Sequence, residues 1–317
     1  MKQIFKIFIF VLAMLLLVSC GTVPAETQND ETDAPETGAP ETESKSETET
    51  ETEAETEEPV LEDTAVFKKM QSVLLVGQSN MVGCGQAAAV EPITDDRIFM
   101  MRNGDWVPMQ EPIHEKAPAN TIGLSASFAK AFVETFDCEI GLIPAAVSGS
   151  AASRWLKSYE GDDGHYAPAI EMAKKAQETT EICAILWHQG ESNRGNKNYA
   201  DLVKQIIDSM IEDLGLDRDK IVIITGEIGA WEGKDVKLVN SALAAIAAEG
   251  YYPNYAVVSQ EGLTNTEKER YGSDSHFDAP SVRVMGYRYF EAFYEELLDR
   301  ECPYEYSQNP DDYRINK

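Results

Sequence analysis

Four polar segments of this chain carry side chains whose types suit acyl transfer. Ser79 lies in the segment GQSNM, directly after an apolar run, where a strand-to-helix turn exposes a hydroxyl beside its own amide N–H. Gly149 in AAVSGSAASRW allows a backbone amide to approach a ligand closely. Gln189 lies in WHQGESN, and His276 lies in DSHFD near the C-terminus. Together they supply a nucleophile, a base and several N–H donors, which is the minimum set for acyl transfer.

Each of these segments also has a structural interpretation. A serine that follows a strand is usually a helix N-cap, and only the accompanying segments favour Ser79 as a nucleophile. His188 directly follows an apolar run, so we expect a hydrogen-bonded core histidine rather than a second base. Glu191 either fixes the loop that carries Gln189 or takes part in catalysis. No histidine and carboxylate cluster has metal-ligand spacing, so the sequence predicts neither a metal nor another cofactor.

The elements that must position these segments alternate between short apolar runs and amphipathic stretches. This alternation is typical of a mostly parallel sheet with helices on both faces, so we expect a flavodoxin-like α/β three-layer sandwich of about five strands. In such sheets ligands bind at the carboxyl ends of the strands, where the first three segments fall. The expected strands are residues 72–76, 138–144, 182–187, 220–225 and 255–259, and the expected helices are residues 124–136, 167–178, 197–214, 235–249 and 281–299.

One further element is expected beside this sheet. Residues 97–109 read RIFMMRNGDWVPM, and the Asn103-Gly104 pair between two apolar runs predicts an added β-hairpin. Arg102, Asn103 and Trp106 of this hairpin are candidates for the lip of a site.

The four segments, in this order along the chain, resemble the SGNH hydrolase superfamily over residues 73–293. More narrowly, the chain is similar to the carbohydrate acetylesterases of that superfamily, the sialate O-acetylesterase and acetylxylan esterase group. The resemblance implies that Ser79 attacks the ester carbonyl while His276 takes its proton and later delivers it to the leaving sugar hydroxyl. It also implies that the oxyanion is held by the N–H groups of Ser79 and Gly149 and by the side-chain amide of Gln189, each worth about 10² to 10³ in rate.

Two positions depart from the superfamily pattern. The third oxyanion donor is usually an asparagine, whereas this chain has Gln189, as in the acetylesterase branch. The orienting aspartate usually lies three residues before the histidine, where this chain has Ser273, and Asp274 lies two residues before it. We expect Asp274 to orient His276, with Glu191 as the alternative or as a residue that shares the role.

Four side chains are candidates for binding the sugar. Gln78 and Asn80 flank the nucleophile, and Arg154 and Trp155 follow the Gly149 turn. An exposed tryptophan often stacks on sugars, although Trp155 has an equally good interpretation as a core residue.

The N-terminus reads as a targeting segment. Residues 1–20 join two lysines to the apolar run IFIFVLAMLLLV and end in LVSC, which resembles the lipobox of bacterial lipoproteins. We therefore expect Cys20 to be lipidated and the chain to be anchored to the membrane at the bacterial cell surface, outside the cytoplasm. A simple secretory signal or an uncleaved anchor is the alternative.

The domain organisation follows from composition. Residues 21–63 are rich in Glu and Thr, cannot bury enough apolar surface to fold, and should form a disordered acidic tether. We expect one esterase domain over residues 64–302 and a C-terminal tail over residues 303–317. Residues 22–63 hold 16 acidic residues and one lysine, which leaves a net charge of about −15 for the domain. This charge argues against nucleic acid and anionic lipid as partners and fits a neutral or weakly charged glycan.

Two functions remain open after these observations, and a third is disfavoured. The first is an esterase for acetylated xylan or a related polysaccharide, with O-acetylated sialic acid as the alternative substrate. The second is a non-catalytic carbohydrate-binding lipoprotein on the same scaffold. The third, a lipase, would need a long apolar segment for an acyl groove, and the domain sequence has none. Oligomeric state is not predicted, and the thiols of the four remaining cysteines are either free or paired: Cys84, Cys138, Cys183 and Cys302.

Overall fold

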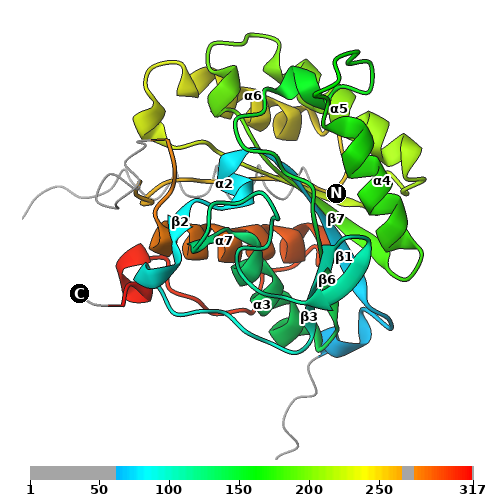
Figure 1. Cartoon of the computed structure of the whole chain (residues 1–317), viewed down its shortest axis with the longest axis vertical. Helices are drawn as coiled ribbons and strands as arrows, with labels where there is room; N and C mark the ends of the chain where they lie inside the picture. The colour runs from blue at the N-terminus through cyan, green and yellow to red at the C-terminus, as the bar shows by residue number, and fades with distance from the viewer. Residues whose placement is uncertain (1–61, 266–274, 316–317) are drawn as a thin grey trace, which may run out of the picture. The chain divides into compact units, whose positions relative to one another are not determined.

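The protein contains one main sheet of seven strands. The computed structural model describes residues 62–265 and 275–315. The strands are β1 (Gln71–Gly77), β3 (Ile98–Arg102), β4 (Asp105–Pro108), β6 (Ile140–Pro144), β7 (Glu181–His188), β8 (Val222–Gly226) and β9 (Tyr255–Val258). They lie in the order β4-β3-β6-β1-β7-β8-β9, and every neighbouring pair is parallel except β3 and β4 (Figure 1). A separate antiparallel pair consists of β2 (Gly85–Gln86) and β5 (Thr121–Ile122).

Helices cover both faces of the sheet, which confirms the expected three-layer α/β class. One face carries α3 (Ser125–Phe136) and α7 (Ala279–Leu298), and the other carries α4 (Tyr166–Gln177), α5 (Tyr199–Asp213) and α6 (Val236–Glu249) (Figure 1). A single helical turn, α2 (Ser79–Val82), follows β1. The ends of the five long helices agree with the expected ranges to within two residues, because apolar periodicity reports directly on which side of a helix is buried.

All five expected strands are present as β1, β6, β7, β8 and β9, and the expected hairpin adds two more strands to the same sheet. Asn103 and Gly104 form its turn with φ angles of 52° and 85°, as an Asn-Gly turn requires. Strand β3 pairs in parallel with β6 over Ile98 to Met100, so the hairpin extends the sheet by two strands. A local pattern predicts a hairpin but does not show which edge accepts it.

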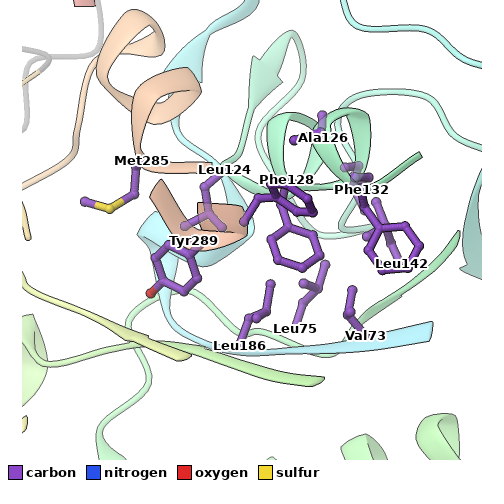
Figure 2. Packing of buried hydrophobic residues seen from close by; sticks show 14 of the residues in the cluster. Val73, Leu75, Leu124, Ala126, Phe128, Phe132, Leu142, Leu186, Met285 and Tyr289 are labelled. Carbon is purple, nitrogen blue, oxygen red and sulfur yellow. The ribbon is translucent and has the colours of Figure 1, made fainter. Parts of the chain in front are cut away.

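Aromatic side chains fill the space between the sheet and the helices α3 and α7. The rings of Phe128 and Phe132 lie 5.6 Å and 5.9 Å from the ring of Phe293. Figure 2 shows the α3 rings above Val73 and Leu75 of β1. Full burial of one such side chain contributes about 1.5 to 3 kcal/mol, so this layer fixes the central strands. The polar segments that follow these strands are therefore held on a rigid edge.

The C-terminal segment, which we expected as a tail, packs along α7. The rings of Tyr306 and Tyr313 lie 5.3 Å and 5.7 Å from the ring of Tyr287. Arg314 forms a 2.9 Å ion pair with Asp278 at the start of α7. Within the described residues, no helix has both the length and the apolar character needed to cross a membrane.

Candidate active site

The turn after β1 presents Ser79 at the carboxyl edge of the sheet. Gly77 has a φ of 131°, and a Cβ there would lie 2.1 Å from the His188 carbonyl oxygen, so this close approach of β1 to β7 requires glycine. The Gln78 N–H donates to the same carbonyl at 2.9 Å. Ser79 then begins α2 and is 8% exposed. Its position depends on the register of two central strands rather than on a flexible loop.

His276 lies against this serine. Its Nε2 is 2.9 Å from Ser79 Oγ, although the two residues are 197 positions apart in the chain. A hydroxyl and an imidazole at this distance form a nucleophile and base pair. The structure thus brings together the two residues expected to carry the chemistry.

Asn80 holds the backbone on both sides of His276. Its Nδ2 donates to the Ser275 carbonyl at 3.1 Å and also to Glu191 Oε1, and its Oδ1 accepts from the Phe277 N–H at 3.1 Å. The side chain is 2% exposed and all its amide groups are bonded to protein. Our expectation that Asn80 binds sugar is therefore corrected, because it positions the histidine loop instead.

Two carboxylates described near the histidine loop have different surroundings. Glu191 is 7% exposed and is joined to the histidine loop through Asn80. Its negative charge adds to the effect of burial, which raises the pKa of the Cys84 thiol to about 11. Asp278 caps α7 by accepting from the Ser281 N–H at 2.9 Å, so it does not serve His276. Asp274, the expected orienting residue, lies outside the described residues.

Gln189 is surrounded by protein acceptors. It is fully buried, and its Nε2 lies 3.0 Å from Gln78 Oε1, 3.1 Å from the Ser150 carbonyl and 2.7 Å from Asn193 Oδ1. Because these protein acceptors use the amide hydrogens, the expectation of an oxyanion donor at Gln189 is corrected.

Gln78 belongs to the same network. Its Oε1 also accepts from the Ser192 N–H at 3.2 Å, and the side chain is only 3% exposed, so its expected contact with sugar is corrected too. Asn193 Oδ1 accepts from the Ala152 N–H at 2.8 Å, which ties the loop after β6 to the loop after β7. Sequence reasoning missed this role, and its only signal was the density of polar residues in WHQGESN.

Two backbone amides of the loops at the carboxyl edge of the sheet have no acceptor among the described residues. Within the described part of the chain, neither the Ser79 N–H nor the Gly149 N–H donates a hydrogen bond. Gly149 is exposed, has a φ of 70°, and has open space where a Cβ would lie. The Val147 N–H donates to the Gly77 carbonyl at 3.0 Å, so the loop before Gly149 is tied to the nucleophile turn. These two amides can bind an oxyanion.

The other two expected sugar-binding residues lie differently. Trp155 is fully buried, with its Nε1 donating to Ser150 Oγ at 2.9 Å and its ring 5.9 Å from that of Trp187. This burial supports the core interpretation of Trp155, and its expected stacking role is corrected. Arg154 is half-exposed and forms a 3.1 Å ion pair with Asp163.

His188 is fully buried under the site. Its Nδ1 lies 3.0 Å from the Tyr289 hydroxyl, which itself donates to the Trp187 carbonyl at 2.9 Å. Burial lowers the pKa of His188 to about 3, so it is neutral at physiological pH. These contacts agree with a core histidine.

The described residues include metal-ligating side-chain types and four cysteines. Within residues 62–265 and 275–315, no group of three His, Cys, Asp or Glu side chains is arranged to hold a metal ion. The four cysteines of this part carry free thiols.

Comparison with known proteins places the chain in a family. A family model described as carbohydrate esterase, sialic acid-specific acetylesterase (SASA) matches residues 69–295. The chain is 28% identical over 178 residues to the probable carbohydrate esterase At4g34215 of Arabidopsis thaliana, a match that spans 46% of this chain and 65% of that protein.

Solved structures share the fold. The X-ray structure of the same Arabidopsis protein superposes with a TM-score of 0.60 at 21% identity, over 73% of this chain and 99% of that one. NanS gives 0.59 at 17% identity, over 73% and 98%. XAC1771, a carbohydrate acetylesterase from Xanthomonas citri, gives 0.54 at 15% identity, over 73% and 57%. Because the family model covers most of the described domain, the chain belongs to the SASA family of carbohydrate esterases.

Proposed function

We propose that this protein is a serine hydrolase that removes O-acetyl groups from carbohydrate through an acetyl-enzyme on Ser79. The observation that carries the proposal is the 2.9 Å contact between Ser79 Oγ and His276 Nε2. Membership of a carbohydrate esterase family supports it. The same contact argues against a decayed, non-catalytic scaffold, because a sugar-binding protein has no need of an aligned base.

The proposed reaction uses few protein atoms. His276 Nε2 takes the Ser79 proton as Oγ attacks the acetyl carbonyl, and the oxyanion accepts from the N–H groups of Ser79 and Gly149. The imidazolium then protonates the departing sugar oxygen. Water attacks the acetyl-enzyme by the same route, with His276 again taking the proton, which releases acetate and restores the serine.

A carboxylate must hold His276 with Nε2 as the acceptor. We assign a share of this task to Glu191, because Asn80 bonds both to Glu191 and to the two residues that flank His276. Asp274 remains the proposed direct partner of the imidazole, as its position in the sequence suggests.

Two substrates are proposed. Acetylated xylan or a related plant polysaccharide is the first, in line with the acidic tether and surface anchor expected from the sequence. O-acetylated sialic acid is the second, and the description of the family favours it.

We also propose that the chain is lipidated at Cys20 and works outside the cytoplasm at the bacterial surface. Residues 1–61 lie outside the described residues, so this proposal depends on the sequence alone. Labelling with radioactive palmitate in a bacterial host tests it: wild type should be labelled and Cys20→Ala should not, whereas label retained in the variant would refute the anchor.

The test of the function is acetate release from acetylated xylan, O-acetylated sialic acid and p-nitrophenyl acetate. Wild type should release acetate from at least one of the carbohydrates, and Ser79→Ala and His276→Ala should not. If wild type releases acetate from none of the three, the esterase proposal fails.

A further inference from the structure

A cavity lies between the hairpin and the loop after β6. Its volume is about 290 Å³, and its walls are the turn after β3, the loop after β6 and the first half of α4. It continues into a wider groove of about 1010 Å³ along α4, and the two share Met101, Asn103, Gly104, Pro168 and Met172. The combined volume is far larger than a single acetyl group needs and has room for sugar residues.

The cavity is connected to the reaction centre through its own walls. Ala145, Ala146 and Val147 line it, and the Val147 N–H donates to the Gly77 carbonyl at 3.0 Å. Two residues further along lies Gly149, one of the two proposed oxyanion donors. A sugar in the cavity would therefore neighbour the sugar whose acetyl group reaches Ser79.

Arg102 gives the cavity its chemical character. Six other arginines of the described residues form ion pairs with carboxylates, whereas within this part of the chain Arg102 forms none. Its Nη2 donates only to uncharged acceptors among the described residues, Met100 Sδ at 3.4 Å and the Pro112 carbonyl at 3.3 Å. The domain carries a large excess of carboxylates, so an arginine left without one at a cavity wall favours an anionic ligand.

The other charged groups at this cavity are Lys116 and Glu115, both exposed. Arg102 and Lys116 together outnumber Glu115, so the cavity is locally positive on an acidic domain. Salt screens exposed charges over about 10 Å, so a bound ligand interacts mainly with the charges of the cavity and less with the net charge of the domain. The expectation of a neutral substrate, which came from that net charge, is therefore modified.

The floor of the cavity is held rigidly. His114 lines it and is 2% exposed, and the loop that carries His114 is fixed by Glu111, which pairs with Arg283 at 2.6 Å. Arg283 and Glu111 side chains are 2% and 10% exposed, so this ion pair is well shielded from water. A rigid wall lowers the ordering cost of binding.

We propose that this cavity is a subsite for a carboxylate-bearing sugar of the acetylated glycan, with Arg102 as the residue that pairs with the carboxylate. The inference rests on the proposed esterase function and names its substrate class: an acidic glycan, whose carboxylate comes from a hexuronate substituent or from a sialic acid. The groove along α4 accommodates the sugars that follow.

The test compares three acetylated substrates with the full chain: a neutral xylo-oligosaccharide, the same oligosaccharide with a glucuronate substituent, and O-acetylated sialic acid. Arg102→Gln removes the proposed contact. Arg288→Gln is the matched control, because it removes one positive charge from the opposite edge of the sheet, beside β9, where the Arg288 guanidinium already donates to the Ser259 and Glu261 carbonyls at 2.8 Å and 2.9 Å. p-Nitrophenyl acetate reports the chemistry without the subsite.

We expect wild type to prefer one carboxylated substrate over the neutral one. In Arg102→Gln the kcat/KM for that substrate should fall by about 10- to 100-fold through KM, as for loss of a charge-assisted hydrogen bond. The neutral oligosaccharide and p-nitrophenyl acetate should be unaffected. The substrate that loses its advantage, glucuronate or sialate, identifies the source of the carboxylate.

Two results would overturn the subsite while leaving the esterase intact: no preference for either carboxylated substrate, or an equal loss on all substrates in Arg102→Gln. Failure of wild type to hydrolyse p-nitrophenyl acetate and all three carbohydrates would instead remove the esterase itself. The two failures are therefore distinguishable.

Discussion

The two halves of the sheet's carboxyl edge use their polar side chains differently. After β1 and β7, Gln78, Asn80 and Gln189 are bonded to other protein groups and are nearly or fully buried. After β3, Arg102 faces a cavity and forms no ion pair with a described residue, and Lys116 lies exposed at the same cavity. The first half is organised before substrate arrives, whereas the second has groups left for the substrate to satisfy.

This difference separates chemistry from recognition. In the proposed mechanism, the described residues of the first half supply a hydroxyl, an imidazole and two backbone amides for the reaction, and Gln78, Asn80 and Gln189 hold the loops that carry them. Changes there should lower kcat on every substrate. Changes in the second half should alter KM for particular glycans and leave the turnover of small esters unchanged.

The largest effect should come from the nucleophile. Ser79→Ala removes the proposed nucleophile, so kcat should fall by about 10⁴ to 10⁶ on all substrates. Acetate release and folding by circular dichroism, measured together, check this. Substantial hydrolysis by a folded Ser79→Ala protein would contradict the assignment of the first half to chemistry.

Removal of a carboxylate should have the second-largest effect on kcat. Glu191→Gln and Asp274→Asn should each lower kcat, with the orienting residue costing about 10² to 10⁴ and KM little changed. Steady-state kinetics on p-nitrophenyl acetate compare the two. If neither variant loses more than a few-fold, a carboxylate is not needed to orient His276, and the proposed mechanism is incomplete.

Asn80→Ala should lower kcat by about 10²-fold, because displacement of the histidine loop by about 1 Å misaligns the base. Asn240→Ala is a matched control. The Asn240 side chain also accepts from a backbone N–H and donates to a backbone carbonyl, both of Ile228, and makes no such bonds to the residues that flank His276. Measurement of kcat and KM for both variants shows whether the loss of kcat is specific to Asn80. An equal, small loss in the two variants would reduce Asn80 to a general stabilising residue.

The smallest effect concerns stability and pH. Burial lowers the pKa of His188 and of His114 to about 3 in the folded chain, whereas unfolded histidine titrates near 6.5. Between these values the unfolded chain binds more protons, so the free energy of unfolding falls as pH falls. We expect a loss of about 1 kcal/mol per histidine between about pH 6.5 and 5.5, where unfolded carboxylates do not yet titrate.

Urea unfolding at pH 6.5 and 5.5 measures this decrease in the free energy of unfolding. His188→Gln and His114→Gln should each make the decrease smaller by about 1 kcal/mol. The two histidines lie in the two halves of the carboxyl edge, so equal shares would mean that both halves are equally well packed. A pH-independent free energy of unfolding would show that the histidines are reached by water.

The fold was predictable wherever burial alone determines the pattern. The range 281–299 expected for the last helix corresponds to α7 (Ala279–Leu298), and the range 72–76 corresponds to β1 (Gln71–Gly77). The strand count was not predictable, because the parallel pairing of β3 with β6 depends on two edges that meet only in the folded chain.

The placement of the candidate catalytic residues was predictable, because serine and histidine types at these positions suggest one chemistry. Ser79 and His276 lie together, and Gly149 has its amide open. The partners of Asn80 lie 111 and 195 residues away in the chain, and no local pattern reports such contacts. Trp155 shows the same limit: a residue type common in both cores and sugar sites does not reveal which it is until its neighbours are known.

The most direct test of the central claim is the mass of the protein during turnover. Wild type mixed rapidly with p-nitrophenyl acetate and quenched in acid should carry one acetyl group, and peptide mapping should locate it on Ser79. Ser79→Ala treated in the same way should carry none. Turnover by wild type with no acetylated Ser79 at any mixing time, or with the acetyl group on another residue, would contradict the acetyl-enzyme mechanism.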